Sequence, residues 1–395
     1  MKILITSDWY LPAVNGVVTS IRNLRDQLEE QGHEVRVLTL AQDREGAAWF
    51  QHGKKEGNVW YLPSLGAGII YPGARTAVGN VGDMLREIIA WGPDVVHSQC
   101  EFATFRFAKK IARVTGAKFL HTYHTVYEDY THYFTPSRSF GKKAAAAFSR
   151  RVLEQVDGVI VPTEKVRRLL EEYGVNRPVY TVPSGIDCRR FARAREQAVS
   201  KALDAPVLVT VGRLAREKNT EEILYWLADP RGKRYSLLIV GDGPCRGELE
   251  GLAKRLGIRE RVFFAGMVKP EEIPDWYQKG RIFVSASGSE TQGLTYLEAL
   301  AGGIPAVCRK DPCLEGVILN GRNGWQYEDR ETFFEALEML EDPQVYRQVS
   351  REAFDRAGAY DQALFAEKIM GVYRNCRKKE EIIRRPYRSQ RRLSG

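Results

Sequence analysis

The sequence predicts an α/β protein made of two doubly wound, Rossmann-like domains that face a central cleft. Short β-branched and leucine-rich runs alternate with helical patterns, which is typical of parallel sheets covered by helices on both faces. The alternation stops near residues 183–205 and then restarts, so it forms two series of domain length. The length of 395 residues, 44% of them hydrophobic, favours the same division, because a single core stops growing at about 250–300 residues.

The apolar runs place the strands. The first series is expected at residues 2–7, 34–39, 95–98, 118–121, 158–161 and 179–182, and the second at 207–211, 236–240, 261–265, 282–285 and 304–308. Helices are expected at 17–30, 102–115, 165–173, 221–227 and 247–256. We assign residues 1–183 to an N-terminal domain and 184–358 to a C-terminal domain. Residues 359–395 are expected to form a further helix and a basic tail.

Composition excludes several classes of protein. No stretch approaches the ~20 apolar residues that span a bilayer, and the six scattered cysteines form neither a CxxC pair nor a cluster with zinc spacing. We therefore expect reduced thiols in a reducing compartment.

The first residues predict a strand rather than a signal segment, so we expect the chain to begin at its own Met1 and to stay in the cytoplasm. The net charge of +9 suits nucleic acid, an anionic membrane or substrate phosphates.

The run SETQGLTYLE at residues 289–298 follows a predicted strand and opens a helix. Gly293 allows a tight turn and close approach of a ligand. The first N–H groups of the helix carry positive dipole, which suits a diphosphate. Glu290 lies on the loop and Glu298 about one turn into the helix. The alternative is that Glu290 caps the helix and Glu298 is a surface acid.

The run VGRLAREKN at residues 211–219 also joins a strand to a helix. Arg213 and Lys218 place two cations at the carboxyl edge of the second sheet, where arginine can bind a phosphate through two donors and lysine as a point charge. A solvated charged loop is the alternative. The turn GDGP at 241–244 either admits a ligand near Gly241 or simply reverses the chain.

Two runs in the N-terminal domain also follow predicted strands. The run DWYLPAVNGV at residues 8–17 joins the first strand to the first helix, and Gly16 allows close backbone approach. It is not the GxGxxG fingerprint of dinucleotide-binding proteins, which argues against a dehydrogenase. The run HTYHTVYEDYTHY at 121–133 holds three of the six histidines. It has no helical i, i+4 histidine pair, so a polar and aromatic pocket wall is favoured over a metal site.

Together these residues resemble glycosyltransferase family 4, which has the GT-B fold. The resemblance rests on Asn15-Gly16, His124, Arg213 with Lys218, and Glu290 spaced eight residues before Glu298, and it spans roughly residues 1–373. It implies an N-terminal domain on the acceptor side, a C-terminal domain that binds a nucleotide sugar, and a last helix that returns to the N-terminal domain. It also implies transfer of a hexose with retention of the anomeric configuration, by departure and attack on one face of the sugar.

The resemblance also implies roles for these residues. Arg213 and Lys218 would hold the donor diphosphate, Glu290 the hydroxyls of the donor sugar, and Glu298 the ribose. His124 would contact the donor sugar near the reacting carbon. We thus expect His124, Glu290, Arg213 and Lys218 to be catalytic. The further donor-binding residues implied are Gly16, Gly241, Met267, Gln292, Gly293 and Leu294, with Met267 beside the base. No metal or other cofactor is expected, because the cations and the helix start can stabilise the leaving diphosphate.

Within the family, the runs at 8–21, 122–133 and 290–298 are most similar to those of bacterial diacylglycerol glucosyltransferases. That similarity implies UDP-glucose as donor, diacylglycerol as acceptor, and monoglucosyldiacylglycerol as product, made at the inner leaflet of the cell membrane. Tyr127 and Tyr130 are expected near the acceptor.

A basic helical pattern independently suggests contact with an anionic membrane surface. In residues 141–153, treated as a helix, cations and apolar side chains occupy opposite halves, a pattern typical of helices that lie on anionic membranes. The cations are Lys142, Lys143, Arg150 and Arg151; the apolar residues are Ala144, Ala145, Phe148 and Val152. The alternative is a helix packed on its own domain with a solvated basic face.

Two other functions stay open at this stage. The same donor motifs would serve an enzyme that glycosylates phosphatidylinositol or a soluble glycan. A nucleic-acid-binding protein that uses the basic tail is a non-enzymatic alternative, although the tail holds one aromatic residue, Tyr387, and no recognised base-reading module. We therefore expect no nucleic-acid partner.

Overall fold

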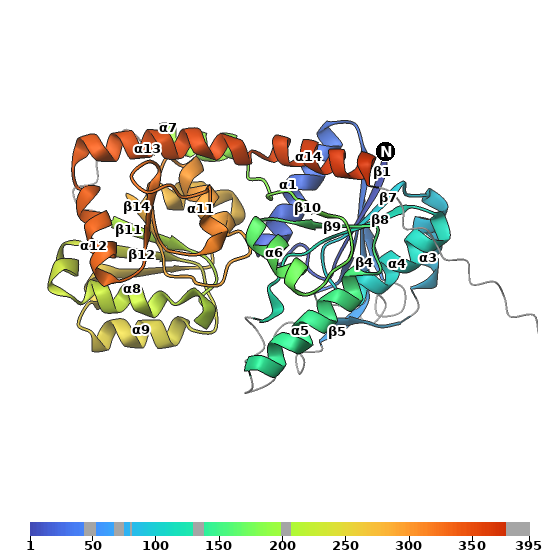
Figure 1. Ribbon diagram of the computed structural model, residues 1–395, viewed down its shortest axis with the longest axis horizontal. Coiled ribbons are helices and arrows are strands. Elements are labelled where there is room, and N and C mark those ends of the chain that lie inside the picture. Colours follow the sequence, from blue (N-terminus) through green and yellow to red (C-terminus); the bar gives the residue numbers. More distant parts are fainter. Residues whose placement is uncertain (43–52, 67–74, 80, 129–137, 199–206, 377–395) are drawn as a thin grey trace, which may run out of the picture.

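The computed structural model describes residues 1–42, 53–66, 75–79, 81–128, 138–198 and 207–376. Two mainly parallel sheets with helices on both faces form its two domains (Figure 1). The predicted α/β architecture of two doubly wound domains is therefore confirmed. All six cysteines lie in the described part and are free thiols. No helix of the described residues is both long and apolar enough to cross a bilayer.

The N-terminal sheet has the strand order β10-β9-β8-β7-β1-β2-β4-β3, in which only β3 is antiparallel to its neighbour. Its strands are β1 (Lys2–Ser7), β2 (Glu34–Leu40), β3 (Lys54–Glu56), β4 (Val59–Leu62), β7 (Val95–Ser98), β8 (Lys118–Thr122), β9 (Gly158–Val161) and β10 (Val179–Thr181). A separate antiparallel pair joins β5 (Ser64–Gly66) to β6 (Arg75–Ala77). The central strands are buried on both faces, so they appear in the sequence as continuous apolar runs.

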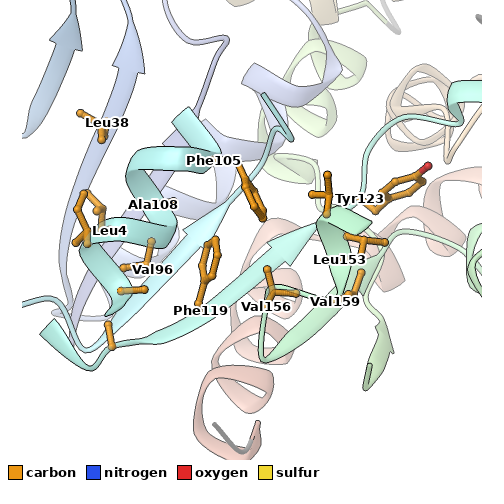
Figure 2. Packing of buried hydrophobic residues seen from close by; sticks show 14 of the residues in the cluster. Leu4, Leu38, Val96, Phe105, Ala108, Phe119, Tyr123, Leu153, Val156 and Val159 are labelled. Carbon is orange, nitrogen blue, oxygen red and sulfur yellow. The ribbon is translucent and has the colours of Figure 1, made fainter. Parts of the chain in front are cut away.

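Helices cover the two faces of this sheet with separate apolar cores. One face carries α3 (Gly82–Trp91), α4 (Ala103–Thr115), α5 (Arg138–Leu153) and α6 (Glu164–Glu172). Figure 2 shows how Phe105 of α4 and Leu153 of α5 pack over Phe119 and Val159 of the strands. The other face carries α1 (Gly16–Glu30) and α14 (Gln362–Asn375). Because α14 follows the C-terminal domain, the chain ends its described part on the N-terminal domain (Figure 1).

The C-terminal sheet is entirely parallel, with the order β13-β12-β11-β14-β15-β16. The strands are β11 (Val207–Val211), β12 (Ser236–Val240), β13 (Val262–Gly266), β14 (Ile282–Ser285), β15 (Ala306–Arg309) and β16 (Gly324–Tyr327). One face is covered by α8 (Thr220–Leu227), α9 (Arg246–Arg255) and α12 (Arg330–Met339). The other is covered by α7 (Cys188–Ala198), α10 (Ile273–Tyr277), α11 (Leu294–Ala301) and α13 (Pro343–Ala357).

The charged stretch that follows the first sheet differs from a simple connection between domains. It forms α7, which packs against α10 and α11 of the C-terminal domain. Phe191 and Ala194 are buried there, three residues apart on one face, while Arg189 and Arg193 are exposed. The sequence analysis did not predict this helix, because its narrow apolar stripe lies among charged residues.

Candidate functional site

The loops that follow β11, β12 and β13 interlock at the carboxyl edge of the C-terminal sheet. Leu214 N–H donates to the carbonyl of Asp242 at 3.0 Å, and Gly241 N–H donates to the carbonyl of Gly266 at 2.9 Å. A Cβ atom added to Gly241 would lie 2.0 Å from the carbonyl oxygen of Gly212. Gly241 therefore permits close backbone packing between two loops, which agrees with the turn interpretation. Met267, the residue after β13, is exposed at this edge.

Lys218 and Glu290 are brought together from two of these loops. The Lys218 ammonium donates to Oε1 of Glu290 at 2.5 Å, and both side chains are largely buried. Glu290 therefore does not cap α11, whose N-cap residue is Gly293. Arg213, on the same loop as Lys218, has an exposed side chain. The pair places one partly buried positive and one partly buried negative group at the strand ends, where ligands bind in open parallel sheets.

The start of α11 is shaped by Gly293. This residue has a left-handed backbone with φ 73°, and a Cβ atom there would lie 2.2 Å from the ring of Tyr296. Only glycine fits that conformation and that gap. Gly293 thereby sets the turn by which the loop that carries Glu290 enters α11, whose first N–H groups carry positive dipole.

Glu298 lies further along α11 and is not a plain surface acid. Its Oε2 accepts a hydrogen bond from the Tyr277 hydroxyl at 2.9 Å. Burial raises the pKa of Glu298 to about 7, and the Tyr277 hydrogen bond and the charge of Arg190 only partly oppose this increase. A carboxyl group with such a pKa can accept hydrogen bonds from hydroxyl groups once it is ionised.

On the N-terminal side, His124 follows β8 and is half-buried. Its Nε2 lies 2.7 Å from Oε1 of Gln99, the residue after β7. Burial lowers the pKa of His124 to about 4, against the opposing effect of Glu101. The imidazole is therefore neutral at physiological pH and offers one donor and one acceptor nitrogen.

Polar side chains fill the space next to His124. His121 Nε2 lies 3.1 Å from Oε1 of Glu101, and the Tyr127 hydroxyl donates to Oε2 of Glu101 at 2.6 Å. The Tyr127 ring also contacts the rings of Phe102 and Phe148 edge to face. Tyr127 thus stands between a buried carboxylate and an aromatic cluster in which Phe102 is 49% exposed. Tyr130 lies outside the described residues.

Direct contacts join the two halves of this site. Lys165 of α6 donates to the carbonyl of Glu290 at 3.0 Å, and the Thr163 hydroxyl donates to the carbonyl of Thr291 at 2.8 Å. A Cβ atom on Gly16 would lie 3.9 Å from Cδ1 of Leu294, so the start of α1 faces the start of α11. Of the predicted residues, Gly16 and the loop from Glu290 to Leu294 thereby meet at the contact between the domains, whereas the printed contacts of His124 lie within the N-terminal domain.

The side chain of Gln292 is engaged away from the strand ends. It accepts from the backbone N–H of Ser184 at 2.9 Å and donates to the Ser184 carbonyl at 3.0 Å. Ser184 also bonds to Ser20 of α1 at 2.9 Å. This side chain therefore holds the connection between the domains, and only the backbone of Gln292 is left for the donor contact implied by the resemblance.

The predicted amphipathic helix is α5, and part of its apolar side is covered by the first domain. Ala145 and Val152 are buried against the first domain, whereas Ala144, placed on the apolar half from the sequence, is exposed. The structure thus matches the alternative of a helix packed on its own domain with a solvated basic face. We call Lys142, Lys143, Arg150 and Arg151, all exposed, the basic face of α5. A concavity of about 560 Å³ borders Arg150 and Arg151. The basic tail after Cys376 lies outside the described residues.

Several site residues escaped the sequence analysis. Gln99 and Glu101 directly follow β7, so the same rule about strand ends that pointed to Arg213 would have found them. Asp311 also follows a strand, β15, but Lys165, with which it pairs across the domains at 2.8 Å, lies inside α6 and had no such signal. Their contact depends on how the two domains meet. Within the described residues, no three His, Cys, Asp or Glu side chains are arranged to hold a metal ion.

Comparisons with known proteins agree with this architecture. The family model "Glycosyltransferase Family 4" matches residues 14–190, and "Glycosyl transferases group 1" matches residues 192–356. Anabaena HepE, solved with UDP and glucose, superposes with a TM-score of 0.71 at 16% identity, over 95% of this chain and all of that one. Sucrose-phosphate synthase from Thermosynechococcus elongatus gives 0.70 at 21% identity, over 94% and 98%. These similarities show a shared fold.

Relatives in sequence extend over most of the chain. Alpha-monoglucosyldiacylglycerol synthase of Streptococcus pneumoniae is 34% identical over 338 residues, covering 83% of this chain and 75% of that protein. The enzyme of the same name from Acholeplasma laidlawii is 28% identical over 397 residues, covering 94% and 96%. A GDP-mannose-dependent phosphatidylinositol monomannoside mannosyltransferase of Mycolicibacterium smegmatis is 30% identical over only 190 residues, or 44% of this chain and 50% of that protein.

Proposed function

Because the chain belongs to glycosyltransferase family 4, we propose that it transfers glucose from UDP-glucose to diacylglycerol and forms monoglucosyldiacylglycerol with retention of configuration. The observation that carries this proposal is the similarity, over most of the chain, to two enzymes named alpha-monoglucosyldiacylglycerol synthase. The phosphatidylinositol-directed relative matches less than half of the chain, which favours diacylglycerol as acceptor. No nucleic-acid partner is proposed.

The donor site of this proposal is the interdomain edge described above. Lys218, Arg213 and the first N–H groups of α11 bind the diphosphate and stabilise the charge that develops as it leaves. Lys218 and Glu290 already form a pair, so Glu290 is held in place to accept hydrogen bonds from the glucose hydroxyls. Glu298 binds the ribose hydroxyls, and Met267 lies beside the base. Because these cationic groups provide the needed charge, the proposal includes no metal.

The N-terminal domain completes the reaction centre. Gly16 leaves room for the diphosphate opposite Leu294, and the neutral His124 contacts the donor sugar near its anomeric carbon. Tyr127 and the half-exposed Phe102 offer a polar group beside an apolar surface, which suits the glycerol hydroxyl and the acyl chains of an amphipathic acceptor. The leaving diphosphate and the attacking hydroxyl then occupy one face of the sugar, which retains the configuration.

We further propose that the enzyme binds peripherally to the cytoplasmic face of the membrane. The basic face of α5 would bind anionic lipid headgroups, and each lysine or arginine near such a surface contributes about 1 kcal/mol. Because Val152 and Leu153 of α5 are packed on the domain, the contact proposed for its basic face is electrostatic. Phe140, near the start of the same helix, is 66% exposed.

A donor-by-acceptor screen with the full chain tests the proposal. UDP-glucose and UDP-galactose are each offered with diacylglycerol vesicles, phosphatidylinositol vesicles or a soluble glycan, and the anomer of the product is determined. We expect α-glucosyldiacylglycerol from UDP-glucose. Glu290→Gln should reduce turnover at least 100-fold, as loss of a transition-state contact does, while Glu335→Gln, at an exposed position of α12, should not. Transfer to another acceptor alone would contradict the proposal.

A further inference from the structure

A chain of hydrogen bonds runs from the C-terminal helix to His124 through the interior of the N-terminal domain. Tyr373 Oη of α14 lies 2.7 Å from Nδ1 of His97. Gln99 Nε2 lies 3.2 Å from Nε2 of His97, and Gln99 Oε1 lies 2.7 Å from Nε2 of His124. Tyr373 and His97 are fully buried and Gln99 is 3% exposed, so competing water is largely excluded from these bonds.

The amide of Gln99 gives this chain a direction. Its oxygen only accepts and its nitrogen only donates. With the Gln99 oxygen facing His124, as the structure has it, His124 carries its proton on Nε2 and Nδ1 keeps a lone pair. In the same orientation His97 accepts at Nε2, where the Gln99 amide at 3.2 Å and the Thr122 hydroxyl at 2.7 Å share its one lone pair, and it donates from Nδ1 to Tyr373. Each ring is thus held in one of its two neutral forms by a neighbour.

We propose that Gln99 is a positioning residue that fixes His124 with Nε2 protonated, so that Nδ1 accepts a hydrogen bond from a hydroxyl of the donor sugar. His97 and Tyr373 hold Gln99 in the orientation that this requires. The proposal rests on the proposed function, which places His124 beside that sugar. It also gives α14 a role beyond packing, because Tyr373 of this helix makes the hydrogen bond that holds His97.

The neutral form of His124 makes its tautomer decisive. Burial is the largest influence on its pKa and lowers it to about 4; Glu101 raises it and His121 lowers it further, and these are the titratable groups that act on it. Burial also holds the pKa of His97 well below its ordinary value. At physiological pH neither ring is charged, so the position of one proton decides which nitrogen of His124 can accept.

Nitrogen-15 NMR of histidine-labelled full chain tests the inference directly, with His124 assigned through His124→Asn. We expect the wild type to show the Nε2–H tautomer. Gln99→Met, which keeps the length but removes the amide, should give a mixture of tautomers. Gln99→Glu places a carboxylate beside Nε2 and should move the titration of His124 upward by roughly 1–3 pH units. Gln348→Met, at an exposed position of α13, is the matched control.

Kinetics with UDP-glucose give a second measurement. Gln99→Met should lower kcat about tenfold, in the range of a lost hydrogen bond, with a smaller change in KM. In Gln99→Glu the apparent pKa of the acidic limb of the pH–rate profile should shift upward by the same amount as the NMR titration of His124. Tyr373→Phe should change the tautomer of His124 less than Gln99→Met does. A wild-type Nδ1–H tautomer, or an unchanged tautomer in Gln99→Met, would overturn the inference. Because NMR needs no turnover, an inactive chain with the Nε2–H tautomer would count against the proposed function alone.

Discussion

Lys165 on α6 of the N-terminal domain lies 2.8 Å from Oδ1 of Asp311, which follows β15 of the C-terminal domain. The same ammonium donates to the carbonyl of Glu290 at 3.0 Å. One side chain of the first domain thus holds both an almost fully buried carboxylate and the backbone of the donor loop. The position of Glu290 therefore depends on the contact between the domains.

Lys165→Met should disturb this contact at both ends. It leaves Asp311 buried without its cation, and because Lys165 is partly exposed we expect a destabilisation of about 1–3 kcal/mol. We also expect kcat/KM for UDP-glucose to fall about tenfold, because the Glu290 loop loses an anchor. Thermal unfolding and initial rates measure the two effects. Arg168→Met is the matched control, because Arg168 pairs with Glu315 across the same domains at 3.6 Å but both side chains are exposed. Equal effects of the two substitutions would contradict the assigned role.

Contacts of this kind mark the limit of what the sequence can predict. Strands such as β1, β7 and β14 were placed at their observed bounds because a buried parallel strand is a continuous apolar run. β16 (Gly-Trp-Gln-Tyr) was missed because glycine and a polar residue interrupt its run. Lys218 and Glu290 could be predicted because each follows a strand of one sheet. The Lys165–Asp311 pair could not, since its two residues are 146 positions apart and belong to different domains.

Gly16→Ala should separate folding from activity. An added Cβ atom would make only ordinary van der Waals contact with Leu294, at 3.9 Å, so we expect the melting temperature to change little. The methyl group would, however, occupy the space assigned to the donor diphosphate, and we expect donor affinity to fall at least tenfold. Calorimetric titration with UDP measures this effect. Wild-type affinity for UDP would place the diphosphate elsewhere.

Neutralising the basic face of α5 should release the enzyme from anionic membranes. Replacing its four cations by glutamine removes roughly 4 kcal/mol of attraction, so we expect binding to vesicles rich in anionic lipid to fall by two orders of magnitude or more. Flotation with such vesicles is the measurement, and binding of the wild type should weaken as salt rises. The matched control replaces four exposed cations of the C-terminal domain, Lys254, Arg255, Arg347 and Arg351. If both variants still float, the membrane contact lies outside α5.

Glu298 should make donor binding and stability depend on pH in opposite directions. Its pKa is about 7 in the folded protein and about 4.3 in an unfolded chain, so the folded state binds more protons between these values. Stability therefore falls as pH rises from about 4.3 to 7, and the full loss is present above 7. Hydroxyl groups of the ribose bind the ionised carboxylate, so donor affinity should instead rise through pH 7. Glu298→Gln should remove both trends, stabilise the ligand-free protein at pH 8 by about 1–2 kcal/mol, and weaken UDP binding. Denaturant unfolding and UDP titration at pH 5.5 and 8 would measure the two trends, with Glu335→Gln as the control. If Glu298→Gln kept the wild-type pH dependence of UDP affinity, Glu298 would not bind the ribose.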